Sequence, residues 1–453
     1  MTSLSTSKIE SQSRACREVL ELILWETLVA RHPADRVLAH HFRTHRHLGS
    51  RDRRILSEAV FATLRWWGWL RCLAPDFPRR TDRPDVRGAA PELAADTAAR
   101  ILLGAHLLEE LPLPPVAEIW TRLTGVRPAG IKPAGAYPDL SARGAAALAL
   151  LGLAHEDGRQ PDIAVLVPPW APDEILQTHP LPELIEWLQR RPPVWLRAQG
   201  PDSAELPREL EAVGIMVQPS PYDQRALRVS APRTNLRTLS SYRSGRFEIQ
   251  DHASQAVGLV CAPAPGQRWW DACAGAGGKA LHLAECMQRT GTVVATDRRE
   301  HALAELRRRA RRAGFPNIQC RAWTGAPLRP SRATFHGVLV DAPCTCSGTW
   351  RRNPDARWSL DRKDINALAA VQLRLLQSAA TGVRSGGVLV YATCSMFQRE
   401  NREVVRDFLG TRTDFSLEPF PHPFRHEMTD GTLQIWPWDA DCDAMFVARL
   451  RRD

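Results

Sequence analysis

The stretch that most constrains the fold of this chain runs from Trp269 to Lys279. Its sequence, WWDACAGAGGK, leads from apolar residues into an aspartate and then into a glycine-rich turn. The residues that follow, 280–285, have the apolar spacing of the first turns of a helix. A strand, a tight turn and a helix N-terminus form a site that a ligand can approach closely, because glycine has no side chain to block it. The stretch therefore predicts the first βα unit of a doubly wound sheet.

A second apolar stretch, residues 292–296, ends at Asp297. An acid at the end of the second strand of such a sheet suits the hydroxyl groups of a ribose, because a carboxylate accepts hydrogen bonds from them. Together the two elements predict a nucleoside-type cofactor that lies across the carboxyl ends of parallel strands. The alternative is that the glycine-rich turn merely connects a strand to a helix.

Strands and helices alternate through the rest of this region. Short β-branched runs at 337–341 and 387–391 are interspersed with helical patterns at 301–313 and 364–383. Such alternation is typical of an α/β fold with a doubly wound parallel sheet, because each parallel crossover needs a helix. We expect this domain to span residues 246–453.

The front of the chain has a different pattern. Residues 10–125 carry apolar positions at helical spacing, and stretches broken by glycine and proline follow at 125–137 and 158–169. We therefore predict an all-helical domain at residues 1–155. A helix and several short strands then predict a small α+β domain at residues 156–245.

One helix of the front domain is predicted from residue 50 onward. Ser50 is a candidate N-cap, and the apolar side chains that follow at helical spacing predict a buried stripe of Ile55, Val60, Leu64, Trp66 and Trp67. Three arginines gather at the helix start, namely Arg51, Arg53 and Arg54. They form either a solvated helix face or a contact to an RNA backbone.

The charge balance favours a nucleic-acid partner. The 453 residues include 60 Lys and Arg against 50 Asp and Glu, a net charge of +10, and nearly all of the cations are arginine. Arginine stacks on bases and grips phosphate with a planar fork, so this bias suits RNA. A genome that prefers arginine codons is the alternative explanation. For the basic run at 307–312 the favoured interpretation is a solvated helix face, and the second is a nucleic-acid contact.

The chain carries no sign of a membrane or secreted protein. No apolar run reaches the roughly 20 residues that a membrane span needs, and residues 1–7 lack the apolar core of a signal peptide. The 10 cysteines have neither the spacing of a disulfide framework nor paired zinc-ligand motifs, so no metal site is predicted. We expect a cytoplasmic, monomeric protein with reduced thiols.

Two cysteines follow the ends of predicted strands. Cys344 closes the sequence Asp-Ala-Pro-Cys that begins at Asp341, and Cys394 follows the strand at 387–391. Functional side chains gather at the carboxyl ends of parallel strands. Near Lys279 and helix N-termini, both thiols are expected to have lowered pKa values and to act as nucleophiles. The alternative is that each is a small buried apolar residue.

A nucleoside cofactor, a thiolate and an acid are the parts needed to methylate C5 of a pyrimidine. That carbon is a weak nucleophile until a thiolate adds to C6 while an acid supports the charge at N3. C5 then takes a methyl group from a sulfonium donor, and a base removes the C5 proton so that the thiolate leaves.

The sequence resembles the RsmB/NOP2/NSUN family of RNA 5-methylcytosine methyltransferases. The resemblance covers residues 246–450 and rests on Asp-Ala-Pro-Cys at 341–344, Gly-Thr-Trp-Arg-Arg-Asn-Pro at 348–354, Ala-Thr-Cys-Ser at 392–395 and Glu-Asn at 400–401. Residues 10–125 are similar to the NusB-like RNA-binding domain that bacterial 16S rRNA enzymes of this family carry in front.

The resemblance implies a role for each of these residues. Cys394 would attack C6 and Cys344 would assist release of the product, while Asp341 holds cytosine N3 and Lys279 orients the site. The S-adenosyl-L-methionine pocket would comprise Ala272, Cys273, Ala274, Gly275, Ala276, Gly277, Gly278, Lys279, Asp297, Trp323 and Asp341. The partner would be RNA, with ribosomal RNA favoured over transfer RNA.

The sequence departs from the family pattern at several positions. The cofactor turn reads Ala-Gly-Ala-Gly at 274–277 where the family more often has Ala-Ala-Pro-Gly, and residues 320–325 offer no acid for the adenine. Gln199 and His336 stand where the family has Asn and Asp. A non-catalytic RNA-binding or ribosome-assembly factor that has lost donor binding is therefore an alternative, and a DNA cytosine methyltransferase is a third.

Overall fold

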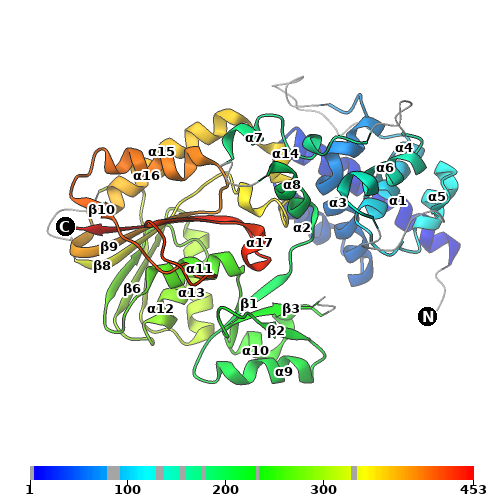
Figure 1. Ribbon diagram of the computed structural model, residues 1–453. Helices are drawn as coiled ribbons and strands as arrows, with labels where there is room; N and C mark the ends of the chain where they lie inside the picture. Colours follow the sequence, from blue (N-terminus) through cyan, green and yellow to red (C-terminus); the bar gives the residue numbers. More distant parts are fainter. Residues whose placement is uncertain are drawn as a thin grey trace. The chain divides into compact units, whose positions relative to one another are not determined.

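The computed structural model describes residues 5–78, 92–128, 137–153, 160–175, 180–230, 234–327 and 334–453. The chain forms two compact units (Figure 1). Unit 1 comprises residues 1–173, 177–191 and 350–360, and unit 2 comprises residues 174–176, 192–349 and 361–453. None of the helices within the described ranges is long and apolar enough to cross a membrane. The predicted division into three domains stays a prediction beside this arrangement.

Unit 1 is built from helices, as the apolar spacing of the front of the chain predicts. The helices are α1 (Thr6–Leu28), α2 (Ala34–Thr44), α3 (Ser50–Leu70), α4 (Ala95–Leu108), α5 (Ala117–Thr124), α6 (Leu140–Leu150), α8 (Leu181–Gln189) and α14 (Ala356–Ser359). The short helix α7 (Ala171–Glu174) crosses from the sequence range of unit 1 into that of unit 2. The likeness to a NusB domain stays a prediction.

Helix α3 buries the predicted apolar stripe. Each member of the stripe from Ile55 to Trp67 is less than 9% exposed. The prediction of Ser50 as N-cap is wrong by one residue, because Gly49 is the N-cap and its amide donates to the carboxylate of Asp52 at 3.2 Å. Asp52 therefore satisfies the helix start from inside the first turn, and Ser50 is the first helical residue.

The three arginines at the start of α3 differ in burial and in hydrogen bonding. Arg53 is half-buried and donates to the main-chain oxygens of Leu48 at 3.0 Å and Phe42 at 3.3 Å. Arg51 and Arg54 are exposed. Arg53 therefore stabilises the connection between α2 and α3, whereas the other two are accessible to a partner.

A small antiparallel sheet opens unit 2. Its strand order is β2-β3-β1-β4, so the first strand of the chain lies between the third and the fourth. The strands are β1 (Val194–Ala198), β2 (Val217–Pro219), β3 (Ala226–Val229) and β4 (Phe247–Ile249), and the helices that follow β1 and β3 are α9 (Leu206–Ala212) and α10 (Ser240–Arg243). Apolar side chains from this sheet and from α9 form one core cluster around Phe247.

The large sheet of unit 2 has the predicted doubly wound parallel arrangement. Its strand order is β10-β12-β9-β8-β5-β6-β7. The chain starts in the middle at β5, moves outward to β7 and returns to β8 on the other side of β5. The parallel strands are β5 (Arg268–Asp271), β6 (Thr292–Asp297), β7 (Ile318–Ala322), β8 (Phe335–Asp341) and β9 (Val383–Thr393). The order reverses between β5 and β8, where such sheets bind their ligands.

The sheet is not parallel throughout, which the sequence did not predict. Strand β12 (Met445–Arg452) pairs antiparallel with β9, and β10 (Phe415–Leu417) and β11 (Thr432–Ile435) pair antiparallel with β12. The fold class is confirmed, and the antiparallel edge is an addition to it.

Helices cover both faces of the large sheet, as Figure 1 shows. Helices α11 (His252–Cys261), α12 (Gly278–Cys286) and α13 (Glu300–Ala313) contribute to one core cluster, and α15 (Arg362–Ala380) and α16 (Arg402–Leu409) to the other. The remaining helix is α17 (Pro437–Ala440). Neighbouring residues of β5 serve opposite faces, because Trp269 packs into the first cluster and Trp270 into the second.

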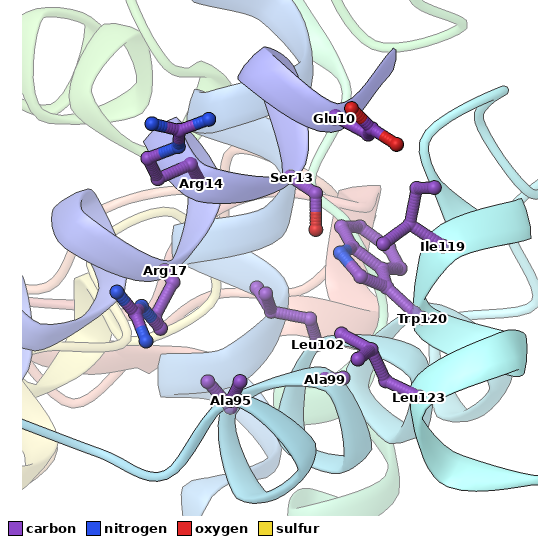
Figure 2. Close-up of a pocket in the computed structure, with 11 residues that line it drawn as sticks. Glu10, Ser13, Arg14, Arg17, Ala95, Ala99, Leu102, Ile119, Trp120 and Leu123 are labelled. Carbon is purple, nitrogen blue, oxygen red and sulfur yellow. The ribbon is translucent and has the colours of Figure 1, made fainter. Parts of the chain in front are cut away.

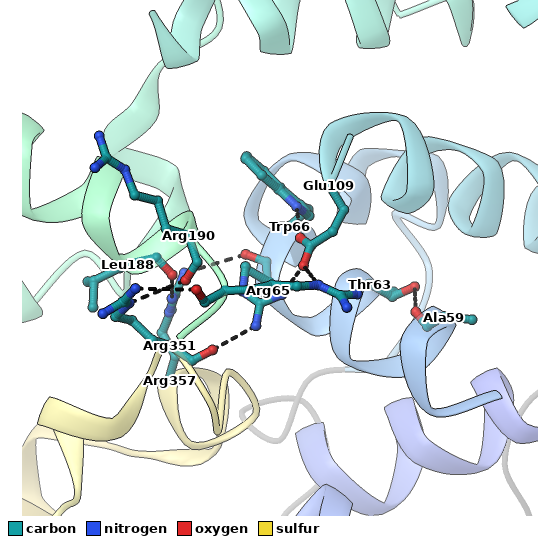
Figure 3. A network of polar contacts seen from close by, with 10 residues as sticks. Ala59, Thr63, Arg65, Trp66, Glu109, Leu188, Arg190, Arg351 and Arg357 are labelled. Carbon is teal, nitrogen blue, oxygen red and sulfur yellow. Dashed lines mark hydrogen bonds and ion pairs between the residues drawn. The ribbon is translucent and has the colours of Figure 1, made fainter. Parts of the chain in front are cut away.

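Residues 350–360 belong to unit 1, although the residues on either side of them belong to unit 2. Arg357 of this segment is fully buried and donates to the main-chain oxygens of Arg65 at 3.4 Å and Leu188 at 3.3 Å (Figure 3). It also donates to the main-chain oxygen of Leu166 at 2.8 Å. Burial, together with the nearby charge of Arg65, lowers the pKa of Arg357 to about 9. The segment therefore joins three separate parts of unit 1 through one guanidinium group.

A second buried arginine extends this network. Arg65 forms an ion pair with Glu109 and donates to the main-chain oxygen of Arg351 at 2.6 Å (Figure 3). The indole N–H of Trp66 donates to the other oxygen of Glu109 at 2.8 Å. Buried charges are tolerated only where hydrogen bonds replace water, and here main-chain carbonyls and one carboxylate do so.

Candidate active site

The glycine-rich turn joins β5 to α12, as predicted. Gly275 and Gly277 have φ angles of +54° and +90°, in the left-handed region that favours glycine. A Cβ on Gly277 would lie 2.5 Å from Cγ of Leu306 in α13, so that helix packs directly against the turn. Arg309 of α13 donates to the main-chain oxygen of Ala276 at 2.7 Å. Part of the basic run at 307–312 therefore fixes the shape of the turn.

The other predicted turn residues alternate between the core and the surface. Ala272 and Ala274 are buried, and their amides donate to main-chain oxygens of the neighbouring strands β8 and β6 at 2.9 and 2.8 Å. Cys273 and Gly278 are half-buried and Ala276 is exposed. The turn is thus anchored to both neighbouring strands while part of it stays accessible to a ligand.

Asp297 lies at the end of β6, where its backbone position was predicted. Its carboxylate accepts a hydrogen bond from the amide of Gly275 at 2.9 Å. It accepts three more from Arg299, one from the amide and two from the guanidinium group, at 2.8 to 3.1 Å. Burial pushes the pKa of Asp297 up, but the bonds from Arg299 and Gly275 outweigh it and the pKa lies below its ordinary value. Asp297 is therefore ionised, and Arg299 is a partner that the sequence did not predict.

Asp271 directly precedes the turn. Asp271 is fully buried at the end of β5, and no side chain among the described residues donates to its carboxyl group. Burial and the neighbouring Asp341 raise the pKa of Asp271 to about 8. A buried acid without a side-chain donor suits a ligand that brings positive charge or N–H groups.

Trp323, the residue predicted near the adenine, follows β7. Its ring lies edge-on to Trp270 with the centroids 5.0 Å apart, and its indole N–H donates to the main-chain oxygen of Ala326 at 2.8 Å. Its amide donates to the main-chain oxygen of Asp297 at 3.3 Å. The predicted adenine position and the predicted ribose position therefore adjoin one another.

Lys279 and Asp341 form an ion pair. The lysine Nζ lies 2.8 Å from Oδ2 of the aspartate, which is the last residue of β8. Burial opposes the charge of Lys279, but the adjacent Asp341 raises the pKa of the lysine above its ordinary value. Burial also raises the pKa of Asp341, although Lys279 acts in the other direction. A proton is therefore available beside the carboxyl group of Asp341.

The two cysteines predicted to be functional lie next to each other. Their sulfur atoms, on Cys344 after β8 and Cys394 after β9, lie 3.4 Å apart and both side chains are half-buried. Hydrogen bonds with the thiols of Cys346 and Cys394, together with burial, raise the pKa of Cys344 well above its ordinary value. The expectation of a lowered pKa is therefore wrong for Cys344, because a neighbouring sulfur disfavours a second negative charge.

Glu400, to which the sequence assigned no role, holds both cysteine loops. Its buried carboxylate accepts hydrogen bonds from the amide and the hydroxyl of Thr345, at 2.9 and 2.5 Å, and from the hydroxyl of Ser395 at 2.5 Å. Thr345 adjoins Cys344 in the sequence, and Ser395 adjoins Cys394. One carboxylate thus fixes the positions of both sulfur atoms, as outer-shell partners do for reactive groups.

Replacing Glu400 by alanine is expected to lower the free energy of unfolding of unit 2 by about 2–4 kcal/mol, because several buried donors lose their acceptor. Gln372, which donates to the same carboxylate at 2.9 Å, is among them. Chemical denaturation measures the loss, and faster modification of Cys344 and Cys394 by a thiol reagent reports the released loops. Glu211→Ala at an exposed position of α9 is the control, with a change within about 0.5 kcal/mol. Unchanged stability and thiol reactivity in Glu400→Ala would contradict the assignment.

Unit 1 contains a cavity of about 190 Å³ (Figure 2). Its walls come from α1, α4 and α5, with Leu102, Ile119 and Trp120 as large apolar side chains, and Arg14 and Arg17 lie along α1. Among the described residues that line it, none is a cysteine or a histidine. It therefore offers no counterpart to the cysteine pair of unit 2.

Relatives of this chain are ribosomal RNA methyltransferases by name. The "Probable ribosomal RNA small subunit methyltransferase B" of Bacillus subtilis is 33% identical over 258 residues, which are 55% of this chain and 57% of that protein. The "Ribosomal RNA small subunit methyltransferase B" of Salmonella paratyphi B is 30% identical over 300 residues, 64% of this chain and 67% of that protein. The chain thus spans little more than half the length of the Bacillus relative.

Solved structures share the fold. The crystal structure of PH0851 matches with a TM-score of 0.73 and 24% identity, and the match covers 100% of both chains. NSun6 from Pyrococcus horikoshii, solved with SFG, matches with a TM-score of 0.50 and 19% identity over 60% of this chain and 93% of that one. These neighbours share the fold of this chain. The model of the 16S rRNA methyltransferase family RsmB/F matches residues 258–451, the part that carries the paired cysteines. With that match and the similarity to the two small-subunit methyltransferases, the chain belongs to the RsmB/F family of methyltransferases.

Proposed function

We propose that this chain methylates C5 of cytosine in RNA, with ribosomal RNA as the substrate, through a covalent bond between Cys394 and C6. The observation that carries the proposal is the 3.4 Å separation of the sulfur atoms of Cys344 and Cys394. The Lys279–Asp341 ion pair adds an acid and a cation at the same ends of the strands. A thiol pair, an acid and a cation are the groups that this reaction needs.

In the first step the thiolate of Cys394 adds to C6 of the base and N3 gains a proton. Asp341 supplies the hydrogen bond or proton at N3, since burial raises the pKa of its carboxyl group. Lys279, at 2.8 Å, holds that carboxyl group in place and offsets negative charge near the thiolate. The electron pair that the thiolate brings makes C5 nucleophilic.

S-adenosylmethionine is the methyl donor of this family and supplies an electrophilic methyl group when it is bound. The residues that would hold it are those of the turn 272–278 and Asp297, with Trp323 beside the adenine and Asp271 as the buried acid. All four lone-pair positions of the Asp297 carboxylate accept a hydrogen bond already. At least one hydrogen bond from Arg299 to Asp297 therefore has to break before a ribose hydroxyl can donate to this carboxylate.

Release follows once C5 carries the methyl group. A base takes the C5 proton, the bond between the Cys394 sulfur and C6 breaks, and N3 returns its proton to the carboxylate of Asp341, so that the ring is aromatic and neutral again. Cys344 assists this step from its position 3.4 Å away. Its raised pKa keeps it neutral while Cys394 reacts, so the pair does not carry two negative charges at once.

The RNA has to present an unstacked base. A cytosine inside a helix cannot reach a pocket at a sheet edge, so a single-stranded loop or a flipped nucleotide is the substrate. The net charge of +10 favours binding to phosphate, and the exposed Arg51 and Arg54 are candidate contacts.

The test is transfer of labelled methyl groups from S-adenosylmethionine to RNA and to DNA of matched sequence. RNA is expected to be labelled at cytosine, and bisulfite sequencing of RNA from a deletion strain is expected to show one lost position. Label in DNA but not in RNA, or no lost position in ribosomal RNA, would overturn the proposal.

A further inference from the structure

A third cysteine completes the group at the strand ends. The sulfur atoms of Cys344, Cys346 and Cys394 all lie within 4.8 Å of one another. Cys346 has a φ of +57°, which is uncommon for a residue with a side chain. Its thiol lies 3.5 Å from the main-chain oxygen of Cys344, and its own main-chain oxygen accepts from the amide of Thr349 at 2.9 Å. The loop conformation therefore turns the third sulfur toward the other two.

The spacing of the sulfurs suits one metal ion. Zinc bound to thiolates has Zn–S distances of about 2.3 Å, so that the sulfurs of a tetrahedral site are about 3.8 Å apart. The sulfurs of Cys344 and Cys394 are 3.4 Å apart and all three lie within 4.8 Å of one another, which is compatible with that value. Each of the three side chains is half-buried, so an ion can reach them.

The donor set selects the kind of metal. The carboxylate of Glu400, which holds the two loops, accepts hydrogen bonds from Thr345, Gln372 and Ser395, and that of Asp341 is paired with Lys279. The group within 4.8 Å, among the described residues, consists of three sulfurs and no carboxylate, which suits a zinc-class cation and not magnesium or calcium, because those ions require oxygen ligands. The ammonium group of Lys279 offsets part of the negative charge that three thiolates bring.

We propose that Cys344, Cys346 and Cys394 form a binding site for one thiophilic divalent cation such as Zn²⁺, with a fourth coordination position left open. Binding replaces three S–H bonds by three metal–sulfur bonds and releases three protons, without any change in oxidation state. The ion would hold both sulfurs that the proposed function needs. It is therefore an inhibitor of methyl transfer, and this consequence rests on the proposed function, whereas the binding does not.

The sequence alone does not indicate this site. Cys344 and Cys346 are separated by one residue and Cys394 follows a different strand, so the spacing lacks the paired motif of structural zinc sites. The pairing of β8 with β9, in which Asp341 lies opposite Ala392, brings the ends of the two strands and their loops together.

The test uses the full chain, stripped of metal and then loaded with Zn²⁺ alone. X-ray absorption is expected to show three sulfur ligands at about 2.3 Å. Cys346→Ser and Cys346→Ala are expected to weaken zinc binding by more than about 10-fold, the lower end of the loss that even outer-shell changes produce. Cys286→Ser, at a half-buried thiol of α12, is the matched control and is expected to bind zinc as the unaltered chain does.

Fewer than three sulfur ligands, or Cys346 variants that bind as tightly as the unaltered chain, would overturn the proposal. Thermal unfolding without metal checks the fold, and if one Cys346 variant fails to fold, the other decides. Zinc is also expected to suppress methyl transfer less in the Cys346 variants than in the unaltered chain. A chain that binds zinc through three sulfurs but never methylates RNA would remove the proposed function and leave the metal site standing.

Discussion

Replacing Cys394 by alanine is expected to abolish methyl transfer to RNA, with a loss of at least about 10⁴-fold in rate, since no other group can form the bond to C6. Cys344 lies 3.4 Å from Cys394 but does not replace it, because hydrogen bonding with Cys346 and burial still raise the pKa of Cys344 in this variant. The measurement is incorporation of labelled methyl groups into RNA. Substantial turnover by Cys394→Ala would contradict the assignment of the nucleophile.

Replacing Cys344 by alanine is the companion experiment, with the opposite outcome on the covalent bond. Addition of Cys394 to C6 still occurs, but release is slowed, so an RNA–protein adduct is expected to accumulate and to survive denaturing electrophoresis. Cys286→Ala, at a half-buried thiol of α12, is expected to turn over normally and to form no lasting adduct. An adduct with Cys394→Ala and none with Cys344→Ala would reverse the two roles.

Replacing Arg357 by methionine is expected to lower the free energy of unfolding of unit 1 by about 3–5 kcal/mol. Methionine keeps much of the volume, but the carbonyl oxygens of Arg65, Leu166 and Leu188 lose a charged, fully buried donor. Buried acceptors left without a donor cost about 1–3 kcal/mol each, and the losses are not fully additive. Chemical denaturation together with hydrogen exchange of the α3 and α8 amides measures the effect.

The matched control for Arg357→Met is Arg54→Met. Arg54 is exposed near the start of α3, so its replacement is expected to change the free energy of unfolding by less than about 0.5 kcal/mol. Equal effects of the two substitutions would mean that the main-chain bonds of Arg357 contribute little to stability.

Four of the parallel strands, β5, β6, β8 and β9, could be predicted because each contains a short apolar run closed by a polar residue, a pattern that β7, with the sequence IQCRA, lacks. The antiparallel edge could not, because β12 carries Arg449 and Arg451, which makes it look like a solvated surface. Both side chains are neutralised by Glu418, which lies far away in the sequence. A pairing of this kind appears only once the strands are folded.

In the candidate site, too, contacts between residues far apart in the sequence could not be predicted. Cys344 and Cys394 could be placed together because both follow strand ends, and parallel strands end on one edge. The role of Glu400 could not be predicted, since its partners Thr345 and Ser395 come from two different loops. Arg299 was missed for another reason: an arginine two residues after Asp297 resembles an ordinary surface residue until its hydrogen bonds are known.

The discontinuity of unit 1 has a consequence for the order in which the protein matures. A ribosome that has made residues 1–191 has produced the helices of this unit other than α14, but it has not made Arg357, so the main-chain oxygens of Arg65 in α3 and Leu188 in α8 lack this donor. The unit reaches its final state only when residue 360 has emerged, by which time Cys344 and its loop have been synthesised as well. Nascent chains arrested before that point should thus be protease-sensitive in the helices of unit 1.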